Sequence, residues 1–129
     1  MNIEEVREYI LAFPEVEEVE QFTDIIVYKI AGKWFAVCSF ERPDYIAVKC
    51  DPDRATVLRD EYDAVTPAWH FNKKHWNDLR ISSLPSGMVK REIRHSYLTV
   101  IRRNVTPKAL RQELEAAAER AGIDDSVQE

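Results

Sequence analysis

Hydrophobic positions along the chain follow two periods, and the changes between them mark the predicted elements. Spacings of three and four predict helices with one buried face over 2–13, 52–62, 87–103 and 107–121. Runs rich in β-branched and aromatic residues predict strands over 22–30, 34–40 and 45–49, with two more inside 66–81. We therefore predict an α+β fold in the order helix, three strands, helix, two strands, helix. The helices pack on an antiparallel sheet, and one further helix follows at the C-terminus.

Short polar segments separate these elements. Pro14 ends the first helix, and Ala31-Gly32-Lys33 forms the turn between the first two predicted strands. Asn72-Lys73-Lys74 forms a tight turn between the last two. With no long linker in the chain, we expect one domain over 1–105, followed by a C-terminal helix and a frayed tail over 106–129.

Composition narrows the class of protein. The chain has 129 residues, of which 45% are hydrophobic, enough to fill a core. No apolar run approaches the ~20 residues of a membrane helix, and the acidic N-terminus does not resemble a secretory signal. Two cysteines without a CxxC pattern form neither a disulfide framework nor a zinc finger. We expect a cytoplasmic protein with no membrane partner.

The formal net charge of −5 hides an uneven distribution. Residues 1–24 carry a net charge of −7, whereas residues 69–103 carry +6 and all three histidines. Because phosphate binding depends on the local potential, the average charge does not exclude a nucleic-acid partner. The alternative is that the blocks are solvated faces that attract one another within the fold.

Sequence signals for catalysis are weak. The chain has no glycine-rich phosphate loop, no GxSxG and no HExxH. Cys38 and Cys50 lie in apolar strand contexts, which favours buried core cysteines. His70 and His75 flank a turn that contains lysines, which repel a metal ion. We therefore predict no enzyme, no catalytic residue, no metal site and no cofactor.

The segment 69–76, WHFNKKHW, is the candidate site. One interpretation is a nucleic-acid wing, in which lysines contact phosphates and aromatic rings stack on bases. The other is structural, with tryptophans in the core, histidines bonded to the backbone and lysines that keep a turn soluble. On the first interpretation the predicted nucleic-acid-binding residues are His70, Asn72, Lys73, Lys74, His75 and Trp76, with Arg80, Lys90, Arg91 and Arg94 as further contacts.

The sequence resembles the MmcQ/YjbR family of small bacterial proteins over about residues 3–105. The resemblance rests on an Asn-Lys-x-His-Trp turn at 72–76, on Leu84-Pro85, on His95-Ser96-Tyr97 with a following basic pair, and on Phe13-Pro14. It implies a fold similar to type III secretion chaperones and distantly to frataxin-like CyaY proteins. The family is commonly labelled DNA-binding through a double-wing arrangement of hairpins, and it supplies no catalytic residue. The C-terminal helix is longer than the family leads us to expect.

Two functions of different classes follow. The first is DNA binding through the basic aromatic hairpin, which weakens as salt rises. The second is a protein-interaction or chaperone-like domain that uses an exposed sheet face or the C-terminal helix. We expect a monomer or a weak dimer. Basic side chains gathered on one surface favour DNA, whereas scattered or paired ones favour the structural interpretation.

Overall fold

The computed structural model describes residues 1–68 and 71–125, and these form four helices and six strands. The helices are α1 (Ile3–Leu11), α2 (Pro52–Glu61), α3 (Ser86–Asn104) and α4 (Lys108–Arg120). The strands are β1 (Val16–Gln21), β2 (Ile25–Ile30), β3 (Lys33–Ser39), β4 (Arg42–Lys49), β5 (Val65–Pro67) and β6 (Trp76–Arg80).

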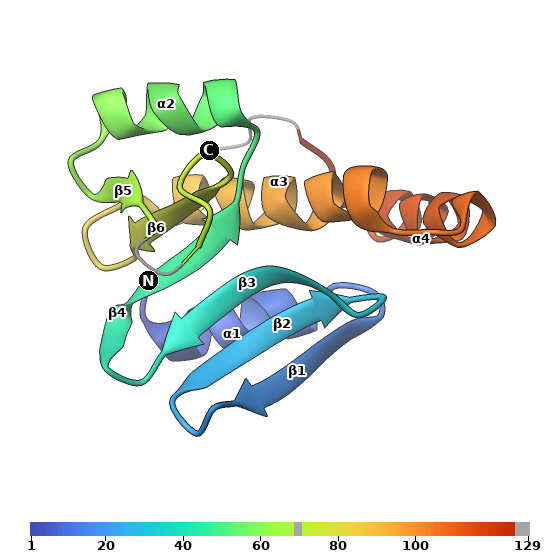
Figure 1. Cartoon of the computed structure of the whole chain (residues 1–129), viewed down its shortest axis with the longest axis horizontal. Coiled ribbons are helices and arrows are strands. Elements are labelled where there is room, and N and C mark those ends of the chain that lie inside the picture. The colour runs from blue at the N-terminus through green and yellow to red at the C-terminus, as the bar shows by residue number, and fades with distance from the viewer. Residues whose placement is uncertain (69–70, 126–129) are drawn as a thin grey trace.

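All six strands form one antiparallel sheet in the order β1-β2-β3-β4-β6-β5 (Figure 1). The predicted α+β class and the helices packed on an antiparallel sheet are therefore confirmed. The predicted turn between β2 and β3 is also present, with Ala31 and Gly32 both at positive φ. Two left-handed residues in succession match the twist of the flanking strands, and Gly32 takes that conformation without a steric penalty.

The sheet has one strand more than the sequence predicts, because β1 precedes the first of the predicted strands. Half of its six residues are glutamates, which have low β propensity, so the segment resembles a loop in sequence. It forms a strand because the apolar β2 offers it a full ladder, from Val16 opposite Ile30 to Gln21 opposite Ile25. The predicted strand over 22–30 accordingly begins only at Ile25.

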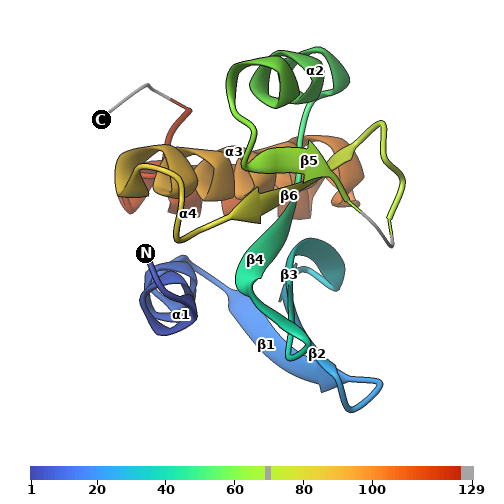
Figure 2. The ribbon, with the colours of Figure 1, turned by 90° about the vertical axis from the view of Figure 1, so that its left-hand side faces the viewer.

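Within residues 1–68 and 71–125, helices cover only one face of the sheet. In Figures 1 and 2, α1 and α3 lie on one side, and residues 71–75, the loop that leads into β6, lie on the opposite side. The tight turn predicted at 72–74 is part of this longer connection, because the ladder between β5 and β6 ends at Pro67 opposite Asn77. We call the two sides the covered face and the open face.

Aromatic rings and one stripe of α3 fill the core under the covered face. Phe13 and Phe35 both pack edge-on against Tyr97, with ring centroids 4.9 and 5.3 Å away. The predicted inward stripe of α3 is confirmed, and each of its residues is buried: Val89, Ile93, Tyr97, Val100 and Ile101.

Consecutive polar groups at the middle of α3 fasten it to the sheet. Ser96 Oγ donates to the carbonyl of Phe35 at 2.5 Å and accepts from the backbone N–H of Lys49 at 2.9 Å, so it joins β3 to β4. Tyr97 Oη donates to the carbonyl of Pro14 at 2.6 Å and holds the end of α1. Two residues of the His-Ser-Tyr motif therefore connect elements of the fold.

α4 packs on α3 and adds Leu114 and Ala118 to the same core. After Gly122 the chain turns back, Ile123 is buried, and Asp125 pairs with Arg102. The division at residue 105 stays a prediction, and residues 126–129 of the expected tail lie outside the described part. None of the helices within that part has both the length and the apolar character needed to cross a membrane.

Candidate binding site

The described part of the predicted wing, residues 71–76, contains a loop shaped by its own hydrogen bonds. Asn72 Oδ1 accepts from the N–H of Lys74 at 3.0 Å, and the Asn72 carbonyl accepts from both His75 and Trp76. The His75 carbonyl accepts from the N–H of Cys50 at 2.7 Å, which ties the loop to the end of β4. Lys74 is exposed, whereas only 8% of Trp76 is exposed. His70 lies outside the described residues, as does Trp69.

Arg59 of α2 anchors this loop, a role that the sequence does not reveal. Its guanidinium donates to Asn77 Oδ1 at 2.7 Å and to the Trp76 carbonyl at 3.2 Å, and also to the Lys73 carbonyl. A periodic helix pattern marks Arg59 only as an outward residue. Its partners become neighbours through the tertiary fold alone.

The other predicted contacts do not join the loop on one surface. Arg80 pairs with Asp44 at 3.0 Å near the end of β6. On α3, Lys90 lies over the ring of Tyr9, and Arg94 Nη1 donates to Tyr9 Oη at 2.9 Å. Because Tyr9 belongs to α1, these two cations lie toward the covered face, away from the loop (Figure 2). Arg91 pairs with Glu92 at 3.1 Å.

A groove of about 490 Å³ lies on the open face. Four aromatic rings from distant parts of the chain line it: Phe22, Trp34, Tyr45 and Phe71. Its floor includes Val37 and Ala47, from the small apolar cluster that Trp76 joins. Phe71 stacks on Trp76 with centroids 4.8 Å apart and contacts Trp34 edge-on. We call this feature the aromatic groove. Sequence analysis missed it because the β1–β2 turn, β3, β4 and the loop meet only in the folded chain.

Charged groups at one end of the aromatic groove are mainly acidic. The lining contains three carboxylates, from Asp24, Glu41 and Asp78, and one guanidinium, from Arg42. Arg42 pairs with Asp78 at 3.0 Å and lies 3.9 Å from the ring centroid of Tyr45. Burial opposes the charge of Arg42, but the hydrogen bonds and charge interactions with Asp78 and Tyr45 together outweigh it, and the pKa of Arg42 is raised.

Phe22 occupies an unfavourable position at the mouth of the groove. Its φ is 53° and that of Thr23 is 64°, in the left-handed region that glycine and asparagine favour at a hairpin turn. Its side chain is 75% exposed, and Phe40 on the adjacent turn is 55% exposed. The two turns are joined by a hydrogen bond from the Phe40 N–H to the Asp24 carbonyl.

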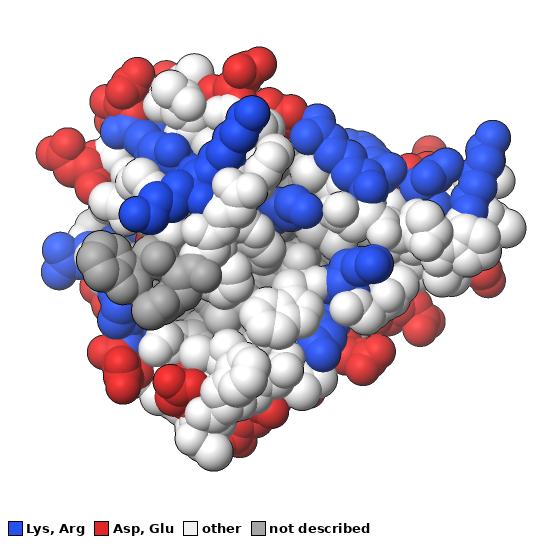
Figure 3. All heavy atoms as spheres, viewed as in Figure 1, with Lys and Arg blue, Asp and Glu red and all other residues white. Residues whose placement is uncertain are grey.

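The opposite end of the open face is basic. Lys29 lies over the ring of Trp34. Burial, together with the nearby charges of Arg103 and Lys33, lowers the pKa of Lys49. Figure 3 shows this face with a hollow near its centre, with blue side chains above and to the right of the hollow and red ones toward the lower left.

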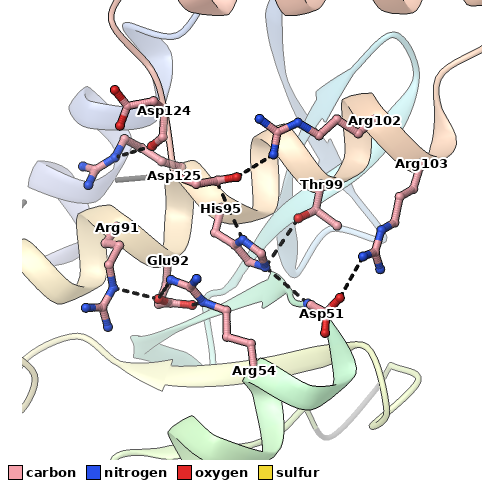
Figure 4. A network of polar contacts seen from close by, with 11 residues as sticks. Asp51, Arg54, Arg91, Glu92, His95, Thr99, Arg102, Arg103, Asp124 and Asp125 are labelled. Carbon is pink, nitrogen blue, oxygen red and sulfur yellow. Dashed lines mark hydrogen bonds and ion pairs between the residues drawn. The ribbon is translucent and has the colours of Figure 1, made fainter. Parts of the chain in front are cut away.

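A second polar cluster joins α2, α3 and the C-terminal segment (Figure 4). Glu92, only 1% exposed, receives two hydrogen bonds from Arg54, at 2.6 and 3.1 Å, and one from Arg91. His95 Nε2 accepts from the N–H of Asp51 at 3.3 Å, so this acceptor is unprotonated. Burial first, and then the charge of Arg54, lower the pKa of His95. The cluster fastens the helices together, and the Glu92 carboxylate already accepts three hydrogen bonds within the protein.

The predicted buried cysteines are confirmed. Burial raises the pKa of both the Cys38 and the Cys50 thiol to about 12, so both remain protonated near neutral pH. Among the described residues, no group of three or more His, Cys, Asp or Glu side chains is arranged to hold a metal ion.

Known proteins resemble the chain over most of its length in one case and over part of it in another. The YjbR protein of Escherichia coli K12, an uncharacterized protein, is 29% identical over 115 residues, which cover 87% of this chain and 96% of that protein. The uncharacterized protein YbdF of Escherichia coli O157:H7 is 39% identical over 51 residues, which cover 39% of this chain and 42% of YbdF.

Solved structures share the fold. Protein DR2400 of Deinococcus radiodurans, with the domain DUF419, matches with a TM-score of 0.76 and 25% identity, covering 98% of this chain and 92% of that one. A Pseudomonas syringae protein matches with a TM-score of 0.64 and 22% identity, covering 74% of this chain and 96% of its own. The YjbR family model matches residues 11–99, a span that includes the loop, the groove and most of α3. The chain therefore belongs to the YjbR family.

Proposed function

We propose that the protein is a non-enzymatic interaction domain and that its aromatic groove receives an apolar segment of a partner protein. The observation that carries this proposal is the pair of exposed rings, Phe22 and Phe40, on neighbouring turns beside a concave aromatic surface. Water-exposed aromatic rings at a concave surface are typical of protein interfaces, where such rings supply much of the binding energy.

The groove has the size and lining of a binding site. A volume of about 490 Å³ suits one or two large side chains of a partner. The walls are preformed, since Phe71 and Trp76 stack on each other and Trp34 packs against Phe71. Preformed walls reduce the entropy that is lost on binding. The protonated thiols of Cys38 and Cys50 support a role without nucleophilic catalysis.

The proposal is tested by capture of partners from a nuclease-treated lysate of the source organism with immobilised wild-type protein, Phe22→Ala and Val57→Ala. Val57 is a matched control, since it is an exposed apolar residue, 52% exposed, on α2 and outside the groove. We expect the wild type and Val57→Ala to retain the same proteins and Phe22→Ala to lose them. Equal retention by all three proteins, or retention by none, contradicts the proposal.

Nucleic-acid binding is the second candidate, now through the open face as a whole. It is favoured by the basic end of this face, where Lys29 lies over Trp34 and where burial first, and then the nearby charges of Arg103 and Lys33, lower the pKa of Lys49. Basic side chains beside aromatic rings are typical of surfaces that bind single strands. The exposed Lys74 of the loop extends this surface.

Mobility shifts with single- and double-stranded DNA at low salt test this candidate. We compare the wild type with Lys73→Glu/Lys74→Glu and with Lys33→Glu/Lys49→Glu. Binding that weakens in either variant and falls steeply with salt supports a DNA contact. Equal binding by all three proteins, or none at about 10⁻⁴ M, near the weak end of non-specific affinity, contradicts it.

A further inference from the structure

We infer that the aromatic groove recognises a basic side chain, an arginine or a lysine, within an apolar segment of the partner. The inference rests on the proposed function, because it specifies the chemistry of the segment that the groove receives. It is carried by the lining, in which four aromatic rings are combined with three carboxylates and a single guanidinium. Ring faces and carboxylates both attract cations, so the two parts of the lining favour the same ligand.

Two of the carboxylates are available. Arg42 pairs with Asp78, whereas neither Asp24 nor Glu41 forms an ion pair with any residue of the described part. Both side chains are exposed at the acidic end of the groove. A guanidinium or ammonium that enters beside them gains charge-assisted hydrogen bonds and brings the lining closer to neutrality.

The protein already uses the same recognition once within its own chain. Arg42 lies over Tyr45, 3.9 Å from the ring centroid, while its Nη1 donates to Asp78 at 3.0 Å. A cation between an aromatic face and a carboxylate is therefore compatible with the geometry of this end of the sheet. Phe22, Asp24 and Glu41 line the same groove, so a second ring and two further carboxylates are present for a cation supplied by a ligand.

The turn between β1 and β2 gives independent support, because Phe22 destabilises the folded protein in two ways. A bulky residue at φ 53° is strained, and a ring that is 75% exposed gains little from the fold. Glycine or asparagine fits the turn better. A ring kept at the mouth of the groove against both penalties is explained when the ring contacts a ligand.

The charge distribution on the open face also orients the segment. Lys29 and Lys49 lie at the opposite end from Asp24 and Glu41. A basic side chain is repelled at the Lys29 end and attracted at the Asp24 end. The basic residue of the partner therefore lies beside the β1–β2 turn, and phosphate groups are disfavoured there.

The test is titration, by fluorescence polarisation, of two labelled and capped valine-rich heptapeptides that differ only in carrying two arginines or two glutamates. The proteins are the wild type, Phe22→Gly, Thr23→Gly and Asp24→Asn/Glu41→Gln. Thr23→Gly is the matched control, since it relieves the same left-handed strain and leaves the Phe22 ring in place. Thermal unfolding checks that every variant is folded.

We expect the arginine peptide to bind the wild type and Thr23→Gly about 10-fold more tightly than the glutamate peptide. Phe22→Gly is expected to lower the affinity for the arginine peptide about 10-fold. Asp24→Asn/Glu41→Gln is expected to reduce the preference for the arginine peptide over the glutamate peptide to about 3-fold or less, without weakening the binding of the glutamate peptide. Salt at 0.5 M is also expected to reduce this preference.

Equal binding of both peptides, with loss of both in Phe22→Gly, overturns the basic specificity and leaves the groove as a protein-binding site. Affinities unchanged by Phe22→Gly, or no binding of either peptide, overturn both the inference and the groove. Tight binding of a labelled thymidine 12-mer that is lost in Phe22→Gly assigns the groove to nucleic acid instead, and likewise overturns the inference.

Discussion

The two faces of the sheet come from the same strands, yet the aromatic residues on one face are packed together and those on the other face border an open groove. On the covered face, Phe13, Phe35 and Tyr97 interlock and exclude water. On the open face, Trp34, Phe71 and Phe22 surround a hollow instead of filling it. Since side chains alternate along each strand, one segment supplies both kinds of surface. We propose that the covered face provides the stability of the fold, whereas the open face is the surface on which a partner binds.

The largest expected effect comes from two neighbours on β3 that lie on opposite faces. Phe35→Ala is expected to lower the free energy of unfolding by about 4 kcal/mol, because it leaves a cavity in the covered core. Trp34→Ala is expected to cost only about 1 kcal/mol, the value of one aromatic pair, because its ring borders the groove. Urea denaturation measures both values. Equal losses contradict the division of roles between the faces.

The next effect concerns the polar cluster that fastens the covering helices. Glu92→Gln is expected to cost about 3 kcal/mol, because it removes the buried charge that Arg54 and Arg91 share. Glu61→Gln, at an exposed position on α2, is the control and is expected to change little. Chemical denaturation of both variants gives the comparison. A loss no larger than that of the control means that packing alone holds these helices on the sheet.

A smaller effect is expected from pH. Because the pKa of His95 is lowered in the folded protein, the unfolded chain binds more protons as the pH falls below about 6.5, the ordinary value for histidine. The contribution of His95 to stability is therefore complete above that pH and is lost on acidification. His95→Gln keeps an acceptor for the N–H of Asp51, and we expect it to reduce the fall in stability between pH 7.5 and pH 5. Identical pH profiles of the wild type and the variant contradict this assignment.

The smallest expected effect is a gain on the open side. Thr23→Gly is expected to raise the free energy of unfolding by about 1 kcal/mol, since a β-branched residue at φ 64° is strained and glycine is not. Thermal denaturation measures the gain. A loss of stability means that the Thr23 side chain supports the turn in spite of its backbone.

Local sequence patterns predict the covered side of the molecule well. The buried stripe of α3 follows directly from its helical period, and the turn at Ala31-Gly32 follows from its residue types. β1 escapes prediction, because its pairing with β2 overrides a glutamate-rich sequence. Local propensity is a weak guide where the partner strand decides the structure.

The candidate site is far less predictable, for a physical reason. The motif residues that resemble the family mostly support the fold: Asn72 shapes the loop, Ser96 joins two strands and Tyr97 holds the end of α1. The groove depends instead on a sheet face that no helix of the described residues covers, and on Phe22, which its sequence pattern assigns to a strand. No local pattern records which face of a sheet remains open.

We expect the acidic β1 strand to limit association of the protein at high concentration. β1 is the first strand of the sheet, so the outer edge of its backbone faces away from β2. Such an edge is a template for a strand of another molecule, and the charged Glu17 and Glu20 side chains keep two copies apart by repulsion. Replacement of both glutamates by uncharged residues is therefore expected to promote edge-to-edge aggregation in concentrated solutions of this protein.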